Sequence, residues 1–200
     1  ATHSQSVEAI FAHIPGLKVA MPSSPADAAG LLRTAIRDDN PVMFFEHKAL
    51  YATKGEVPDD PDFAIPFGQA NIVKEGKDVT LIATSLYVSK ALEVANQLER
   101  EGVSVELIDP RTLIPFDTKT VVESVKKTGR AVIVHEAHKN AGIGAEIAST
   151  IMEEAFPYLD APVVRLGAKA CPLPFNLGLE NAVVPQAEDI IDAIKQVTYR

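Results

Sequence analysis

The sequence has little cysteine and no long hydrophobic run. Cys171 is the only cysteine among 200 residues, so an internal disulfide and a zinc site built on paired cysteines are excluded. It precedes Pro172 in an apolar stretch without an adjacent histidine, which predicts a buried, unreactive thiol. No apolar run approaches the roughly 20 residues that cross a bilayer, and the chain does not open on a basic region followed by an apolar stretch. We therefore expect an intracellular protein without membrane contact.

Clusters of lysine and arginine are also absent, and the net charge is -8. Phosphate backbones are bound by clustered cations, so a nucleic-acid partner is not expected. The charge is uneven along the chain: residues 1–57 carry 5 basic and 6 acidic side chains (net -1), and residues 58–200 carry 14 and 21 (net -7). The acidic second part favours a basic macromolecular partner.

Short β-branched runs alternate with stretches of helical periodicity along most of the chain. This pattern is typical of βα units around a mainly parallel sheet, so the predicted fold class is α/β. With 46% hydrophobic residues the chain can bury a sizeable core. The predicted helices are 4–14, 25–38, 86–101, 117–128, 143–156 and 187–197. The predicted strands are 17–21, 41–46, 79–84, 103–108, 131–135 and 162–166.

Several predicted helix ends carry capping residues. Ser24 before Pro25 is typical of an N-cap followed by proline in the first helical position. Asp117 can cap the helix that follows it, and Gly102 and Gly129 stand where a left-handed C-cap is needed. These local signals agree with the periodicity.

The domain organisation is predicted from a break in this rhythm. Residues 58–78 are rich in proline, glycine and aspartate, which indicates a linker between a first unit, 1–57, and a second, 79–200. Residues 79–166 supply four strands and three helices, enough for a doubly wound domain. Residues 1–46 supply two strands and two helices, too few to cover both faces of a parallel sheet. We expect them to belong to a larger domain whose beginning is missing.

The motifs that could carry chemistry are few. The sequence His135-Glu136-Ala137-His138 is not the helical zinc motif His-Glu-x-x-His, so metal binding there is not expected. Residues at the carboxyl ends of parallel strands tend to face ligands, so His135 and Glu136 are predicted to line a subunit interface or cleft. His47 is a weaker candidate. Gly142 and Gly144 lack the third glycine of a dinucleotide fingerprint, which leaves a tight strand-to-helix turn as their expected role.

An ordered set of short stretches resembles one enzyme family. In this order, and at compatible spacing, the chain resembles the beta subunit of thiamine-diphosphate-dependent 2-oxo acid dehydrogenases over essentially all of its length. The stretches are His3-Ser4-Gln5-Ser6, Pro15-Gly16-Leu17-Lys18-Val19, Ala35-Ile36-Arg37-Asp38-Asp39-Asn40-Pro41-Val42, Ile108-Asp109-Pro110-Arg111-Thr112-Leu113, Gly144-Ala145-Glu146-Ile147 and Leu159-Asp160-Ala161-Pro162.

The resemblance implies a fold and an activity. The fold would be the end of a pyrimidine-binding domain followed by a transketolase C-terminal-like domain. The activity would be that of an oxidoreductase subunit: oxidative decarboxylation of pyruvate or a related 2-oxo acid, or cleavage of acetoin, with acyl transfer to lipoyl-lysine. The subunit would work in the cytoplasm of a bacterium or in the mitochondrial matrix. We expect the 200-residue chain alone to be inactive.

His3 is the catalytic residue that the resemblance implies. An imidazole donates and accepts protons near neutral pH, and His3 stands at the start of a predicted helix. By resemblance it matches a histidine that faces the cofactor and assists reductive acylation of the lipoyl group. Thiamine diphosphate would be shared with an alpha subunit that also holds magnesium. No Gly-Asp-Gly magnesium motif occurs here, and no cofactor-binding residue is expected within this chain.

The resemblance also implies an ion site and a docking site. Ala35, Asp38 and Asn40 match positions that bind a structural potassium ion in members of the family. Asp160 and the C-terminal carboxylate of Arg200 match the attachment point of the dihydrolipoyl acyltransferase core. The expected assembly is an alpha2beta2 heterotetramer.

Two alternative functions stay open from the sequence. The chain could be a fragment of a transketolase or deoxyxylulose-phosphate synthase, which would need basic residues for a sugar phosphate, and only scattered arginines are present. Alternatively, it could be a non-catalytic module that docks an alpha subunit and an acyltransferase.

Overall fold

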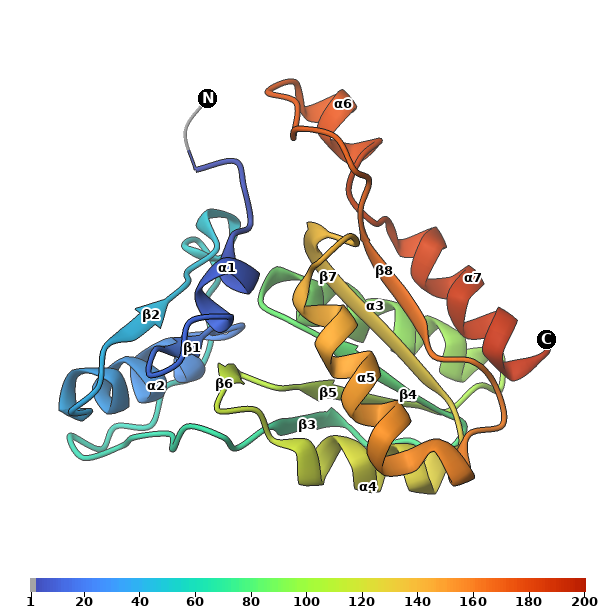
Figure 1. The fold of residues 1–200 in the computed structure, drawn as a ribbon, viewed down its shortest axis with the longest axis horizontal. Helices are drawn as coiled ribbons and strands as arrows, with labels where there is room; N and C mark the ends of the chain where they lie inside the picture. The colour runs from blue at the N-terminus through green and yellow to red at the C-terminus, as the bar shows by residue number, and fades with distance from the viewer. Residues whose placement is uncertain (1–2) are drawn as a thin grey trace.

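The protein is described here by a computed structural model that covers residues 3–200. Two lobes lie side by side (Figure 1). The N-terminal lobe is built on a small sheet of three strands, in the order β2 (Val42–Phe44), β1 (Lys18–Ala20) and β6 (Thr112–Ile114). β1 is parallel to β2 and antiparallel to β6. The helices α1 (Glu8–Ala12) and α2 (Pro25–Arg37) pack against this sheet.

The C-terminal lobe is built on a larger sheet of five strands. Their order is β3 (Asn71–Lys74), β5 (Val105–Asp109), β4 (Val79–Ala83), β7 (Ala131–His138) and β8 (Val164–Ala168). The last four are mutually parallel, and β3 is an antiparallel edge strand. The predicted α/β class with a mainly parallel sheet is confirmed.

Helices cover both faces of the large sheet. One face carries α3 (Leu86–Arg100) and α7 (Ala187–Thr198), and the other carries α4 (Thr118–Thr128) and α5 (Ile143–Ala155). Successive residues of a strand point to opposite faces, so Leu81 packs with α3 and α7 whereas Ile82 packs with α4 and α5. Val19 of the small sheet joins the second of these clusters, which makes the core continuous between the lobes.

The predicted helix caps are confirmed. The Ser24 hydroxyl accepts a hydrogen bond from the Asp27 N–H at 3.1 Å, and Pro25 begins α2. Asp117 accepts from the Thr120 N–H at 3.1 Å at the start of α4. Gly102 and Gly129 have φ values of 83° and 70°, in the left-handed region that glycine adopts without strain.

Three further elements complete the chain. The 3-10 helices η1 (Lys48–Leu50) and η2 (Phe156–Tyr158) are single turns. The helix α6 (Leu177–Asn181) was not predicted, and Figure 1 shows it projecting from the C-terminal lobe on the segment between β8 and α7. We call residues 170–182 the arm. Its side chains Phe175, Leu177 and Leu179 are exposed.

The structure corrects three predictions of secondary structure. The predicted helix 4–14 is shorter, because α1 begins at Glu8 and no side chain caps its first turn at Val7. The expected linker 58–78 contains β3, whose pairing with β5 has no signal in the local sequence. The strand β6 was missed because it has only three residues before Pro115 and pairs with β1, far back in the chain.

Cys171 is exposed, so the prediction of a buried thiol is wrong. The cysteine belongs to the arm, where Pro172 and Pro174 interrupt regular structure and several apolar side chains are exposed. Within residues 3–200, no helix is long and apolar enough to cross a membrane.

Candidate functional site: a cleft between the two lobes

A cleft of about 490 Å³ lies where the two lobes meet. The C-terminal lobe contributes the ends of its parallel strands, with Thr84 and Ser85 after β4 and Glu136 near the end of β7. The N-terminal lobe contributes residues 3–6, Glu8 and the segment 45–48 with Tyr51. Because loops at the carboxyl ends of parallel strands face solvent at one edge, this is where ligands bind in open α/β sheets.

The residues Glu136 and His47 join the lobes across the cleft. His47 Nε2 lies 2.6 Å from a Glu136 carboxylate oxygen, and His47 Nδ1 accepts a hydrogen bond from the Ala49 N–H at 3.1 Å. Since Nδ1 accepts, the proton of a neutral imidazole is on Nε2 and is donated to Glu136. The Ser6 hydroxyl lies 3.5 Å from the same Glu136 oxygen. Glu136 therefore holds the segment that carries His3 and the segment that carries His47.

Glu8 adds a buried carboxyl group to the cleft. Its side chain belongs to the first turn of α1 and is almost fully buried. Burial raises the pKa of Glu8, a backbone hydrogen bond opposes the increase, and the nearby negative charge of Glu136 adds to it. Glu8 carries no signal of this role in the sequence, because a glutamate at the start of a helix is usually an exposed N-terminal charge.

His3 lines the cleft together with Ser4 and Gln5. It does not stand at a helix N-terminus as expected, since α1 begins five residues later and His3 has a left-handed φ of 61°. Its side chain is exposed at the mouth of the cleft. The structure thus brings His3, His47 and Glu136 to one cleft, although they come from three distant parts of the sequence.

His135 does not line the cleft, and the prediction that it would is wrong. Neighbouring residues of a strand face opposite ways, so Glu136 reaches the cleft while His135 is fully buried beneath α5. A Cβ atom on Gly142, Gly144 or Gly167 would lie within 2.9 Å of the His135 ring, so the three glycines form a cradle for the imidazole. Burial lowers the pKa of His135 to about 4, which keeps the ring neutral.

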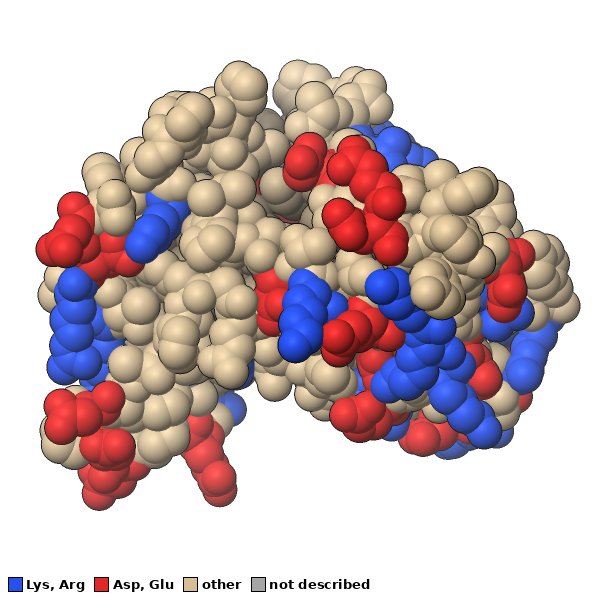
Figure 2. Space-filling model, turned by 60° about the horizontal axis from the view of Figure 1, so that its bottom comes forward, with Lys and Arg blue, Asp and Glu red and all other residues tan. Residues whose placement is uncertain are grey.

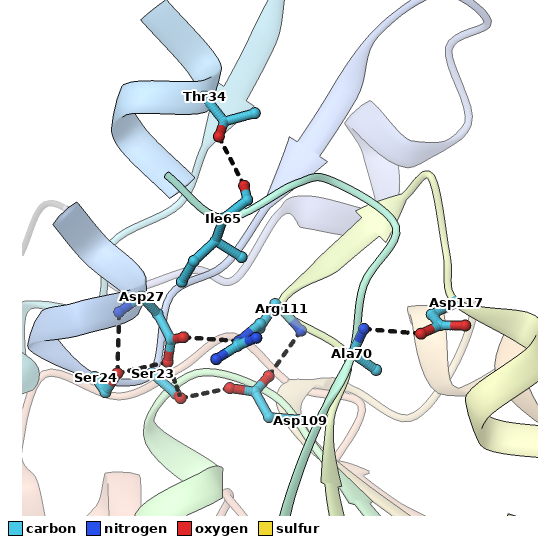
Figure 3. A network of polar contacts seen from close by, with 9 residues as sticks. All are labelled: Ser23, Ser24, Asp27, Thr34, Ile65, Ala70, Asp109, Arg111 and Asp117. Atoms are coloured by element: carbon cyan, nitrogen blue, oxygen red, sulfur yellow. Dashed lines mark hydrogen bonds and ion pairs between the residues drawn. The ribbon is translucent and has the colours of Figure 1, made fainter. Parts of the chain in front are cut away.

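A buried polar network fastens the two lobes together (Figure 3). Arg111, in the turn between β5 and β6, pairs with Asp27 of α2 at 2.7 Å. The Ser23 hydroxyl donates to Asp109 and lies 3.2 Å from an Asp27 carboxylate oxygen. Ser24 donates to Asp27 at 2.6 Å, and the Arg111 N–H donates to Asp109 at 2.8 Å.

Asp109 has the most strongly shifted pKa in this network. Complete burial raises its pKa to about 7, against the lowering effect of the hydrogen bonds from Ser23 and the Arg111 N–H. The connection between the lobes is held in the same region by two further bonds. Thr34 donates to the Ile65 carbonyl at 2.7 Å, and the Ala70 N–H donates to Asp117 at 2.9 Å (Figure 3).

At the residues proposed to hold potassium, Asp38 already has a cationic partner. The ammonium of Lys18 bonds to one Asp38 oxygen, and the other accepts from the N–H and the side-chain amide of Asn40, at 2.9 and 3.1 Å. These bonds lower the pKa of Asp38 to about 2. The Ala35 carbonyl accepts the Asp38 N–H at 3.3 Å. The arrangement does not fit a second cation as it stands, because Lys18 would repel it.

At the proposed docking point, Asp160 is exposed and pairs with Arg130 at 3.1 Å. The Tyr199 hydroxyl donates to the Asp160 carbonyl at 3.1 Å, which holds the end of the chain beside Asp160. Arg200 donates from its guanidinium to the Gly102 carbonyl at 2.7 Å.

Within the described part of the chain, no group of three or more histidine, cysteine, aspartate or glutamate side chains is placed to hold a metal ion.

Two lobes that meet at the carboxyl ends of parallel strands agree with the family that sequence comparison identifies. The family model of the transketolase C-terminal domain matches residues 68–190, and that of the transketolase pyrimidine binding domain matches residues 1–54. The chain belongs to the transketolase C-terminal domain family, preceded by a part of the pyrimidine binding domain.

Named relatives narrow the resemblance. The pyruvate dehydrogenase E1 component subunit beta of Rickettsia felis is 50% identical over 199 residues, and that of Rhizobium meliloti is 47% identical over 200, each along the whole of this chain. The acetoin:2,6-dichlorophenolindophenol oxidoreductase subunit beta of Cupriavidus necator is 46% identical over 98% of the chain. The chain spans 61%, 44% and 58% of these relatives, respectively.

A solved structure agrees with the fold. The split gene transketolase described as an inactive beta4 tetramer is similar with a TM-score of 0.78 and 27% identity, over 96% of this chain and 60% of that one. The similarity to beta subunits of 2-oxo acid and acetoin dehydrogenases, predicted from the ordered motifs, is confirmed.

Proposed function

We propose that this chain is part of the beta subunit of a thiamine-diphosphate-dependent dehydrogenase. Its substrate would be pyruvate, a related 2-oxo acid or acetoin, and the acyl group would pass to lipoyl-lysine. The observation that carries the proposal is the cleft, where the segment that bears His3 is held by Glu136 in a chain about half identical to named beta subunits. Residues 1–57 would be the end of the pyrimidine domain and residues 79–200 the C-terminal domain. Residues 58–78 would connect them and supply the edge strand β3 of the C-terminal sheet.

The charges of the cleft would attract the thiazolium ring of the cofactor and repel its diphosphate. Four carboxyl side chains line it, Glu8, Glu46, Glu136 and Glu180, against the one ammonium of Lys48. This surplus suits the cationic thiazolium ring and would repel the diphosphate. We therefore assign the diphosphate and its magnesium to the alpha subunit. When bound, thiamine diphosphate supplies the carbanion chemistry that cleaves the bond beside the substrate carbonyl.

The residues of this chain would orient groups and move protons. The Glu136 carboxylate accepts a hydrogen bond from His47 Nε2–H, and this bond fixes the imidazole in one tautomer. Its contact with Ser6 steadies the segment that presents His3 to the cleft. His3 would then transfer a proton during acylation of the lipoyl group, a role for which its exposure at the cleft mouth gives it access.

The partners follow from the same proposal. The chain would assemble with an alpha subunit into an alpha2beta2 heterotetramer. The acyltransferase core would dock on Asp160 and the C-terminal carboxylate of Arg200, and the Tyr199 bond that holds these two segments together supports this. Potassium at Ala35, Asp38 and Asn40 stays a prediction, and it requires Lys18 to move away from Asp38.

The test is turnover by the full heteromer. The complete beta subunit, assembled with its native alpha subunit, thiamine diphosphate and magnesium, should reduce lipoamide with pyruvate or acetoin as substrate, and comparison with 2-oxoisovalerate identifies the preferred one. Failure with all three would refute the proposal. Ketol transfer between sugar phosphates would instead support the alternative that the chain is part of a transketolase. The similarity to a split gene transketolase is the observation behind that alternative. Normal turnover by the 200-residue chain with an alpha subunit would refute the prediction that this chain is insufficient.

A further inference from the structure

A second cavity, of about 370 Å³, lies at the end of β8, where the chain enters the arm. Three cationic side chains line it: Lys139, Arg165 and Lys169. We propose that this basic pocket binds the phosphate group of a small phosphorylated molecule. The proposal concerns a site outside the cleft and does not rest on the proposed function.

The backbone holds the three cations on one frame. The Lys139 N–H donates to the Ala168 carbonyl at 3.0 Å, and the Arg165 guanidinium donates to the Lys139 carbonyl at 3.1 Å. The Lys169 N–H donates to the Val183 carbonyl at 3.0 Å, and the Lys169 ammonium donates to the Ala182 carbonyl at 2.7 Å. The Arg165 guanidinium and the Lys169 ammonium are thus held by backbone carbonyls before a ligand arrives, which reduces the entropy lost on binding.

The cations of the basic pocket lack acidic partners. Within residues 3–200, no carboxylate lies within ion-pair distance of Lys139, Arg165 or Lys169. Seven other lysines and arginines form ion pairs, and Figure 2 shows lysine and arginine beside acidic groups on the C-terminal lobe. Asp189, the one carboxylate among the lining residues, accepts the Gln186 N–H at 2.7 Å in the cap of α7. Like charges around one cavity repel each other, and a bound anion would remove this cost.

The lining residues favour a phosphate ester over a simple carboxylate. A phosphomonoester carries about -1.5 to -2 charges at neutral pH and three acceptor oxygens. One guanidinium and two ammonium groups match this charge and this number of acceptors. Apolar side chains also line the basic pocket and would contact the organic part of the ligand. They are Leu166, Ala182, Val183, Val184 and Pro185.

The basic pocket shares a wall with the cleft. Glu180 lines the cleft, while Asn181 to Gln186 line the basic pocket. Tyr87, another residue of the cleft, donates its hydroxyl hydrogen to the Pro185 carbonyl at 2.9 Å. A ligand in the basic pocket would therefore contact the base of the arm directly beside the cleft.

The experiment measures binding of inorganic phosphate and phenyl phosphate to the full 200-residue chain by calorimetry at low salt. We expect saturable binding, tighter for phenyl phosphate because of the apolar lining residues. Arg165→Gln and Lys169→Gln should each weaken it about tenfold or more, since each removes a charge-assisted hydrogen bond. Lys77→Gln, which removes an exposed cation elsewhere, is the matched control and should change nothing. Arg165→Lys, which keeps the charge, should weaken binding less than Arg165→Gln.

Each other outcome overturns the proposal. Equal weakening by Lys77→Gln would mean that overall charge, not the pocket, attracts phosphate. Absence of saturable binding would remove the site. If phenyl phosphate bound no tighter than inorganic phosphate, the claim that the pocket recognises the organic part of a phosphate ester would be wrong. A poly-glutamate peptide that bound more tightly than either would assign the surface to an acidic protein partner instead.

Discussion

Three histidines of this chain differ in role because of their surroundings. His3 is exposed at the cleft, His47 is held by Glu136, and His135 is enclosed by glycines. The sequence ranked His3 first on resemblance and grouped His135 with Glu136. The structure separates those two, since consecutive residues of β7 face opposite sides of the sheet.

The proton-transfer role of His3 predicts a selective loss. His3→Ala in the full beta subunit should lower kcat/KM for lipoamide by about 100-fold or more, the usual contribution of a positioned acid or base. Binding of thiamine diphosphate should be nearly unchanged, because His3 is exposed at the cleft mouth. His13→Ala replaces an exposed histidine that does not line the cleft, and its kinetics should match the wild type. An equal loss of cofactor binding and acyl transfer would contradict the role.

Asp109 predicts a pH dependence of stability. Its pKa is about 7 in the folded protein, well above its ordinary value, so the folded state binds a proton that the unfolded state releases between about pH 4 and pH 7. The free energy of unfolding should therefore fall as the pH rises through this range and level off above about pH 7. The effect of this one group is at most about 4 kcal/mol, because one pKa unit corresponds to about 1.4 kcal/mol.

The measurement is urea denaturation at several pH values. Asp109→Asn should lose this component of the pH dependence, seen as a difference from the wild type, while Ser23, Asp27 and Arg111 stay in place. Asp192→Asn, on the exposed side of α7, should keep it. Parallel profiles for wild type and Asp109→Asn would show that Asp109 stays ionised in the fold.

At the scale of elements, the close packing of α5 on β7 depends on glycine. A Cβ atom at Gly144 would lie 2.6 Å from His135 Nε2, and the ring is fully buried. The sequence assigned Gly142 and Gly144 to a tight turn. The structure adds that they make space for a side chain of the preceding strand.

Gly144→Ala should destabilise the protein by about 1–3 kcal/mol, the usual cost of overpacking a core, despite the better helix propensity of alanine. Gly178→Ala is a useful comparison, because its Cβ would lie 3.3 Å from the end of the Asn176 side chain in the exposed α6. That variant should change stability by less than about 1 kcal/mol. Similar melting temperatures for the two variants would show that the cradle can relax.

At the scale of the whole molecule, one surface is proposed to bind the acyltransferase core. Asp160 stands beside the end of the chain, in a lobe with a surplus of acidic residues. The Asp160 side chain is 59% exposed although its partner Arg130 is only 26% exposed, so the carboxylate stays accessible.

Asp160→Asn should weaken binding of the acyltransferase subunit-binding domain about tenfold and flatten its dependence on salt, because a charge-assisted bond is lost. Asp59→Asn makes the same change of charge at an exposed site in the connection between the lobes and should have no effect. Surface plasmon resonance over a range of salt concentrations provides both quantities. Unchanged affinity at every salt concentration would remove Asp160 from the interface.

The sequence by itself determined the α/β class, most helix ends and the family. These depend on local patterns: apolar periodicity, Ser24 and Asp117 as N-caps, and glycine at positions with left-handed φ. Only the tertiary structure decided which side chains meet. His47 and Glu136 are 89 residues apart, and Ser23 and Asp109 are 86 apart. Contacts at such separations leave no local signal, because strand order and lobe packing, not neighbouring residues, bring them together.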